Sequence, residues 1–275
     1  MKELLSIKEF SKLSGIEVTT LRYWDDIGLF SPVTRDEDNN YRYYSPQQVI
    51  AVNFITVLSN LRVPLKTIRG AKPERDPESI ISLIEQQENY LDSEMRRIRD
   101  SYSIIHTRRD LIKQGLRADP SKISVSEFEE RSIIIGPRNV FPEGKGFYEP
   151  FMNFCRQAQN LRINLSYPIG GMHNSMEAFV SNPSEPDHFF SLDPTGNSCQ
   201  AAGRYMVGYA RGFYGEMDNL PERMMAYAED HALTFSGPLY AVYLHDEICL
   251  NDPAEFLAQI SVAVTGHGKS SRRDR

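Results

Sequence analysis

Apolar residues recur at every seventh position through the stretch from residue 77 to residue 116, and a less purely apolar row runs beside them. A seven-residue apolar repeat predicts a long coiled-coil helix. One amphipathic helix packed on its own domain is the alternative. However, about 40 helical residues would extend about 60 Å, more than a small domain covers. We therefore expect an exposed seam that forms a dimer interface, made by Ile84, Leu91, Ile98, Ile105 and Ile112.

The residues before this stretch predict two short helices. Ser6 and Glu9 have the spacing of a capping box, and Gly15 suits the left-handed turn that ends a helix. A second helix is expected at roughly 18–26, with Leu21 and Trp24 on its apolar side. Two short helices joined by a tight turn that contains glycine are typical of the helix-turn-helix arrangement.

A β-hairpin, or wing, is expected next. Polar residues 34–40 separate two short segments, the second of which is Tyr-Arg-Tyr-Tyr at 41–44. Asn39 and Asn40 at the tip tolerate positive φ. Ser45 and Pro46 then predict a new helix, with the serine as N-cap and the proline at the first helical position. Another short helix is expected to begin near 62–66.

The pattern changes after Gly115 and the pair Asp119-Pro120, which end the long helix. Strands are expected at 132–136, 201–209, 238–245 and 256–264, and helices near 147–160 and 219–232; this mixture predicts an α+β domain. The chain is thus expected to be multidomain: a mostly α winged helix-turn-helix at 1–75, a coiled-coil dimerisation helix at 76–118, an α+β domain at 121–265 and a polar, basic, disordered tail at 266–275.

Composition and charge narrow the class of protein. The net charge of −6 is uneven, because residues 1–72 hold 10 Lys+Arg against 8 Asp+Glu, whereas residues 121–275 hold 13 against 19. Salt screens charges beyond about 8–10 Å, so a mildly basic head on an acidic body is compatible with DNA binding. There is no run of about 18 apolar residues and no signal-peptide pattern. We expect a cytoplasmic protein without membrane association, with three reduced cysteines.

The head resembles the MerR family of transcription regulators over about 70 residues. The resemblance lies in residues 6–15 (Ser-Ile-Lys-Glu-Phe-Ser-Lys-Leu-Ser-Gly), 20–30 (Thr-Leu-Arg-Tyr-Trp-Asp-Asp-Ile-Gly-Leu-Phe) and 41–44, and in the spacing to the long helix. It implies a homodimeric activator that sits in a promoter spacer and distorts it, so that the RNA polymerase holoenzyme engages both promoter elements. Deforming that much DNA costs of order 1–6 kcal/mol, which protein–phosphate contacts offset.

The resemblance also implies which residues contact DNA. The N-terminal part of the second helix is expected in the major groove, where Arg22 would contact either a guanine edge or a phosphate. Tyr23 is either a phosphate contact or a core residue, and Trp24 is expected in the core. The family often has glycine at the wing tip, where this chain has Asn40. The expected DNA-binding residues are Thr19, Thr20, Arg22, Tyr23, Tyr41, Arg42 and Lys66.

The C-terminal domain is similar to gyrase-inhibitor-like ligand-binding domains of the multidrug-sensing branch, at residues 135–140 and 203–205 and in length. The resemblance implies a pocket for bulky aromatic compounds, many of them cationic, since ring faces attract cations. The family's pocket glutamate is absent: Ala241 stands there, leaving Glu177, Asp246, Glu247 or aromatic rings alone to balance a charge. The expected pocket residues are Tyr148, Phe151, Tyr167, Met172, Phe190, Tyr240 and Tyr243.

Other kinds of function are less well supported. Residues 73–120 contain no cysteine and a single histidine, His106, so neither a metal site nor a cofactor is expected. Gyrase-inhibitor-like domains sometimes hydrolyse small electrophiles, but the sequence has no nucleophile–base motif. A fused hydrolase and a DNA-binding regulator without a ligand remain the alternatives to a ligand-responsive, non-enzymatic regulator.

Overall fold

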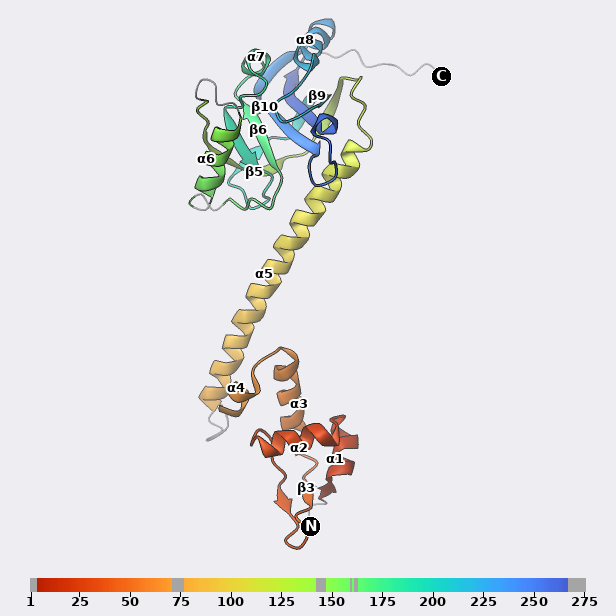
Figure 1. Ribbon diagram of the computed structural model, residues 1–275, viewed down its shortest axis with the longest axis vertical. Coiled ribbons are helices and arrows are strands. Elements are labelled where there is room, and N and C mark those ends of the chain that lie inside the picture. The colour runs from red at the N-terminus through yellow and green to blue at the C-terminus, as the bar shows by residue number, and fades with distance from the viewer. Residues whose placement is uncertain (1–3, 71–76, 142–146, 159, 161–162, 267–275) are drawn as a thin grey trace, which may run out of the picture. The chain divides into compact units, whose positions relative to one another are not determined.

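The computed structural model describes residues 4–70, 77–141, 147–158, 160 and 163–266 (Figure 1). The chain forms two compact units that meet in sequence between Arg96 and Arg97, so the boundary falls inside the long helix. Each unit is described separately below. Most of the predicted tail, at 267–275, lies outside the described residues.

The first unit begins with the predicted helix pair. Ser6 caps the first helix: its hydroxyl accepts a hydrogen bond from the Glu9 amide at 3.4 Å, and the Glu9 carboxylate accepts one from the Ser6 amide at 2.8 Å. Gly15 ends that helix at a φ of 72°, a conformation that glycine adopts without a Cβ penalty. The capping box and the glycine turn are confirmed. The two helices are α1 (Ile7–Ser14) and α2 (Val18–Asp26).

A small antiparallel sheet lies beside these helices, with strand order β1-β3-β2. Phe10, Phe30 and Tyr44 stack in its core, with ring centroids 4.7–5.8 Å apart. The wing is therefore anchored to α1 by rings from three segments. The strands are β1 (Leu5–Ser6), β2 (Thr34–Arg35) and β3 (Arg42–Tyr44).

Two more helices complete the core of the first unit, α3 (Gln48–Asn60) and α4 (Leu65–Gly70). The prediction that Ser45 caps α3 is wrong by two residues. Gln47 occupies the N-cap position with helical dihedral angles, and three turn hydrogen bonds precede the regular helix. The amide of Ser45 donates to the Gln48 side chain at 3.0 Å. Pro46 thus lies in a turn before the helix rather than at its first position.

The long helix predicted from the seven-residue repeat is α5 (Pro77–Gly115), 39 residues in length. Leu83, near its start, is buried against the core of the first unit. Near its end, Leu111 is buried in the second unit. Most residues between these two points are exposed.

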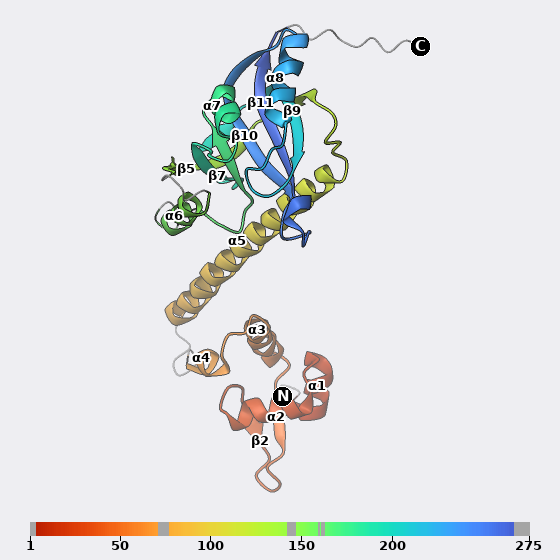
Figure 2. The ribbon, with the colours of Figure 1, turned by 45° about the horizontal axis from the view of Figure 1, so that its top comes forward.

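The second unit is an α+β domain built on one antiparallel sheet, in the order β4-β9-β11-β10-β6-β7-β5-β8 (Figures 1 and 2). All the expected strands and helices occur, with ends shifted by a few residues. Short elements that the pattern did not predict are β4, β6, α7, β7 and β8. The strands are β4 (Ser124–Phe128), β5 (Arg131–Arg138), β6 (Ile169–His173), β7 (His188–Ser191), β8 (Ser198–Gln200), β9 (Gly203–Arg211), β10 (Thr234–His245) and β11 (Leu257–Thr265); the helices are α6 (Tyr148–Ala158), α7 (Met176–Ser181), α8 (Leu220–Asp230) and the 3₁₀ turn η1 (Pro253–Glu255).

The central strands of this sheet bury both faces. Along β10, Leu239 and Ala241 belong to the core beneath α7 and α8, whereas Tyr240 and Val242 belong to the core that includes Leu111 of α5. Neighbouring residues of a strand face opposite sides, so this alternation divides the domain into two cores. The same alternation decides which side chains can reach the ligand pocket described below.

Candidate functional site

Helix α2 presents the residues predicted to face DNA. Thr19 and Arg22 are exposed and Tyr23 is 53% exposed, whereas Thr20 is half-buried. On the opposite side, Leu21 and Trp24 lie in the core of the unit. The exposure of Tyr23 removes the alternative that it is a core residue, and Trp24 is buried as expected. Contacts of this helix with DNA remain predictions.

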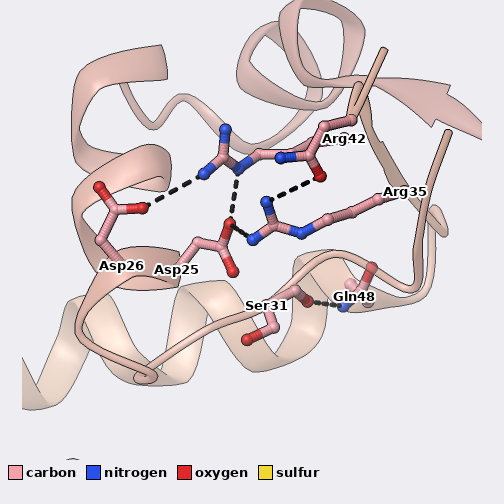
Figure 3. Close-up of polar contacts among 7 residues, drawn as sticks. Asp25, Asp26, Ser31, Arg35, Arg42 and Gln48 are labelled. Carbon is pink, nitrogen blue, oxygen red and sulfur yellow. Dashed lines mark hydrogen bonds and ion pairs between the residues drawn. The ribbon is translucent and has the colours of Figure 1, made fainter. Parts of the chain in front are cut away.

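Asp25, at the end of α2, holds the wing through two arginines (Figure 3). Its carboxylate accepts hydrogen bonds at 2.5 Å from Arg35 Nη2 and at 2.5 Å from Arg42 Nε. The Asp25 side chain is only 3% exposed, and Asp26 adds a longer contact of 3.2 Å with Arg42. The hydrogen bond that Arg42 donates to Asp25 is the main cause that raises the pKa of Arg42. A buried carboxylate therefore joins the end of α2 to both wing strands.

This contact changes the expectation for Arg42. Its side chain is 20% exposed and pairs with two carboxylates within the chain, so much of its charge is balanced before any DNA arrives. Asp25 and Arg35 were not predicted as functional residues. Three charged residues at 25, 35 and 42 are too far apart in sequence for any local pattern to link them.

The rest of the wing and α4 carry the remaining predicted residues. Asn40, at the wing tip, has a φ of 56°, so the expectation that asparagine there tolerates a positive φ is confirmed. Tyr41 beside it is 39% exposed. Lys66 is exposed on the first turn of α4.

The predicted seam on α5 is exposed in both units. In the first unit Ile84 is 37% exposed, and in the second unit Ile98 and Ile105 are 62% and 69% exposed. Leu91 and Ile112 are half-buried.

The end of α5 packs on its own domain. The Ile112 carbonyl lies 3.1 Å from His245 Nε2, and a Cβ at Gly115 would meet the same imidazole ring at 2.5 Å. Glycine thus allows the close approach of helix and strand. The predicted dimer contact is accordingly best carried by the exposed residues before Ile112.

A pocket of about 500 Å³ opens in the second unit, a size suited to a drug-sized ligand. Its walls are mostly aromatic: Phe147 stacks on Tyr214 at 5.6 Å, and Phe147 and Phe151 both meet Phe189 edge-on at 5.3–5.5 Å. Ala241 of β10 also lines it, where the family's acid would stand. Of the residues predicted to bind ligand, the pocket brings together Tyr148, Phe151 and Tyr243.

Four of the predicted pocket residues do not line it. Met172, Phe190 and Tyr240 are buried in the other core of the sheet, and Tyr167 is 2% exposed and also absent from the lining. Strand parity is the reason for Tyr240, because Ala241 and Tyr243 face the pocket and Tyr240, next to Ala241 along the strand, faces the opposite side of the sheet. Assigning Met172, Phe190, Tyr167 and Tyr240 to the pocket was therefore wrong.

The aromatic pocket residues left out of the ligand-binding prediction are Phe147, Phe189, Phe213, Tyr214 and Phe256. Tyr214 has the densest set of contacts, with Phe147, Phe213, Tyr243 and Phe256 all within ring-contact distance. Phe147 directly precedes α6, Phe189 lies on β7, Phe213 and Tyr214 lie in the loop after β9, and Phe256 directly follows η1. The abundance of aromatic residues in the sequence pointed to an aromatic pocket, but their spacing did not identify these five residues.

Polar groups in the pocket are few and mostly paired. The Tyr214 hydroxyl donates to Glu247 at 2.5 Å, and burial followed by this hydrogen bond raises the pKa of Tyr214. Tyr243 donates to the Phe213 carbonyl at 3.0 Å and accepts from the Gly215 amide at 2.9 Å, with burial raising its pKa. Burial lowers the pKa of His173 to about 4, so this ring is neutral at pH 7. The pocket is therefore an aromatic cage with acidic groups at one side.

Within the described ranges, no three His, Cys, Asp or Glu side chains come together in a way that would hold a metal ion. None of the helices described is long and apolar enough to cross a membrane.

A winged helix-turn-helix joined through a long helix to an α+β domain with an aromatic pocket defines a multidomain DNA-binding regulator. Residues 5–74 match the family described as MerR HTH family regulatory protein. The head of the chain is therefore a MerR-type helix-turn-helix domain.

Two curated relatives, both from Bacillus subtilis (strain 168), are similar to this chain. The Multidrug-efflux transporter 2 regulator is 26% identical over 270 residues, which cover 96% of this chain and 97% of the relative. The Multidrug-efflux transporter 1 regulator is 32% identical over 176 residues, 60% of each protein.

Among solved structures, a cryo-EM structure of an EcmrR–DNA complex in EcmrR-RPo is 19% identical, covering 94% of this chain and 99% of that one, with a TM-score of 0.39. A TM-score below 0.5 is too low to establish a shared arrangement of the whole chain.

Proposed function

We propose that this protein is a ligand-responsive transcription activator that binds promoter DNA as a homodimer and senses bulky aromatic compounds, including cationic ones. The observation that carries the proposal is an aromatic pocket of about 500 Å³ in a chain that begins with a MerR-type head. The relatives named as regulators of multidrug-efflux transporters support this class of ligand.

The pocket suits such ligands for a physical reason. Rings in contact at 5–6 Å present both faces and edges to a guest, and an aromatic face attracts a cation by about 0.5–2 kcal/mol per contact. Glu247 adds a carboxylate at the pocket wall. It takes the place of the acid that Ala241 does not supply.

Dimerisation is supported by exposed apolar surface in each unit. In the seam of α5, Ile98 and Ile105 are each more than half exposed. On α3 in the first unit, Ile50 is 74% and Val57 55% exposed. Burying such side chains in a partner stabilises a dimer by about 25 cal/mol per Å² of apolar surface.

The action on DNA follows from two heads held in one dimer. Each would place α2, with Thr19, Arg22 and Tyr23, in successive major grooves. The contacts of both heads would bend and untwist the spacer between them, and RNA polymerase holoenzyme is the partner that this deformation serves. A ligand would act by shifting the balance between bound states with undistorted and distorted DNA.

The ligand-binding step is tested by filling the pocket. Ala241→Trp places an indole ring in the pocket, and Ala226→Trp makes the same change at an exposed position of α8. We expect calorimetry to show binding of tetraphenylphosphonium to the wild type and to Ala226→Trp, and a loss of at least about tenfold in Ala241→Trp. Equal affinity in the two variants would place the ligand elsewhere.

The regulatory step is tested by transcription in vitro from the promoter next to the gene that encodes this protein. Tetraphenylphosphonium should increase the transcript with wild-type protein and with Ala226→Trp, but not with Ala241→Trp. If tetraphenylphosphonium increased the transcript equally with all three proteins, regulation would not depend on this pocket.

A further inference from the structure

Three charged side chains line the pocket: Arg108, Asp246 and Glu247. Arg108 comes from α5, whereas the two acids follow directly after β10. All three belong to the second unit. The helix that carries the predicted dimer seam thus also contributes a cation to the wall of the ligand pocket.

The two acids have different hydrogen-bond and charge partners. Arg108 Nη1 lies 2.8 Å from Asp246 Oδ2, with the two side chains 25% and 15% exposed. The other oxygen of Asp246 accepts a hydrogen bond from the Ile248 amide at 3.1 Å. Glu247 instead accepts its 2.5 Å hydrogen bond from Tyr214, a neutral group. Asp246 is therefore balanced by a cation, and Glu247 is held in place by a hydroxyl.

His173, Tyr214 and Tyr243 of the described pocket lining do not change this balance, because burial keeps each of them neutral at pH 7. The wall therefore carries one unbalanced negative charge. We propose that Arg108 sets the charge preference of the pocket: by neutralising Asp246 it leaves Glu247 as the carboxylate that meets the ligand, so the pocket favours singly charged aromatic cations over doubly charged ones. This inference rests on the proposed ligand-binding function and names the class of ligand within it.

Removing Arg108 and removing the charge of Asp246 should have opposite effects on the charge preference of the pocket. Without Arg108 the wall carries two negative charges, which favours a dication. Without the charge of Asp246 the wall is neutral overall, and Arg108 then repels a second positive charge. Interactions between charges in a partly dry cavity are much stronger than in water, so both effects are large enough to measure as affinity ratios.

The test uses ethidium and propidium, which share one aromatic ring system, whereas propidium carries a second positive charge on its side chain. Fluorescence titration of the full-length protein without DNA gives the ratio of the two affinities for each variant. Arg108→Met keeps the apolar stem of the side chain, Arg108→Lys keeps the charge, and Asp246→Asn keeps the shape.

We expect the ratio to shift toward propidium by about tenfold in Arg108→Met, to shift toward ethidium in Asp246→Asn, and to stay within about twofold of wild type in Arg108→Lys. General damage to the fold lowers both affinities and does not move the ratio in opposite directions. An unchanged ratio in both Arg108→Met and Asp246→Asn, with both dyes bound, would overturn the charge rule alone. If the wild type binds neither dye, the proposed ligand-binding function fails together with the charge rule.

Discussion

Replacing Asp25 by asparagine should destabilise the DNA-binding head without changing its shape. Asp25 is buried and receives two charge-assisted hydrogen bonds, each 2.5 Å long, from Arg35 and Arg42. Such bonds contribute about 1.5–3 kcal/mol each, against about 0.5–1.5 kcal/mol for neutral ones. Asparagine retains an acceptor oxygen but not the charge, so the two contacts together should lose about 2 kcal/mol. The larger cost of a fully buried, unpaired charge does not apply, because both arginines are partly exposed and can rehydrate.

The assay can be confined to the head, because Trp24 is the only tryptophan of the chain and lies in the core of the first unit. Urea unfolding followed by its fluorescence should show a midpoint lower by about 1–2 M for Asp25→Asn, with a slope near 1–2 kcal/mol/M. Asp26→Asn is the matched control: this side chain is 66% exposed and its single contact is 3.2 Å long, so its midpoint should move by less than about 0.5 M. Equal shifts in the two variants would refute the assignment of Asp25 as the residue that joins helix and wing.

Three further outcomes test other parts of the molecule. Arg22→Ala should abolish promoter binding in a gel-shift assay while sedimentation still shows a dimer; unchanged affinity would contradict the placement of α2 on DNA. Ile98→Asp should give monomers in sedimentation, whereas Ser93→Asp, at an exposed position outside the apolar seam of α5, should not, and a dimeric Ile98→Asp would argue against the seam. Because burial lowers the pKa of His173 to about 4, below its unfolded value of about 6.5, the unfolded chain binds protons more readily and stability is lost as the pH falls from 6.5 toward 4. Thermal unfolding should show a loss of about 2 kcal/mol between pH 7 and pH 5, reduced in His173→Gln; an equal loss in the variant would assign the pH effect to other groups.

Features that depend on neighbours in sequence could be predicted. The Ser6–Glu9 capping box, the glycine turn and the positive φ of Asn40 rest on interactions within three or four residues. The long helix α5 follows from a repeat that any partner-facing seam must keep. The resemblance to the MerR family was also visible in the sequence, because it lies in contiguous segments of the head.

The sites themselves were settled by tertiary structure. Asp25 meets Arg35 and Arg42 only because the hairpin folds back on the end of α2. Tyr240 and Tyr243 are both aromatic, but an odd spacing along β10 puts them on opposite faces of the sheet, so one lies in a core and the other lines the cavity. Strand order and register come from packing between distant segments, which a local pattern of residues does not encode. The sequence alone therefore determined the longer elements and the MerR-type head, and only the folded chain decided which side chains meet.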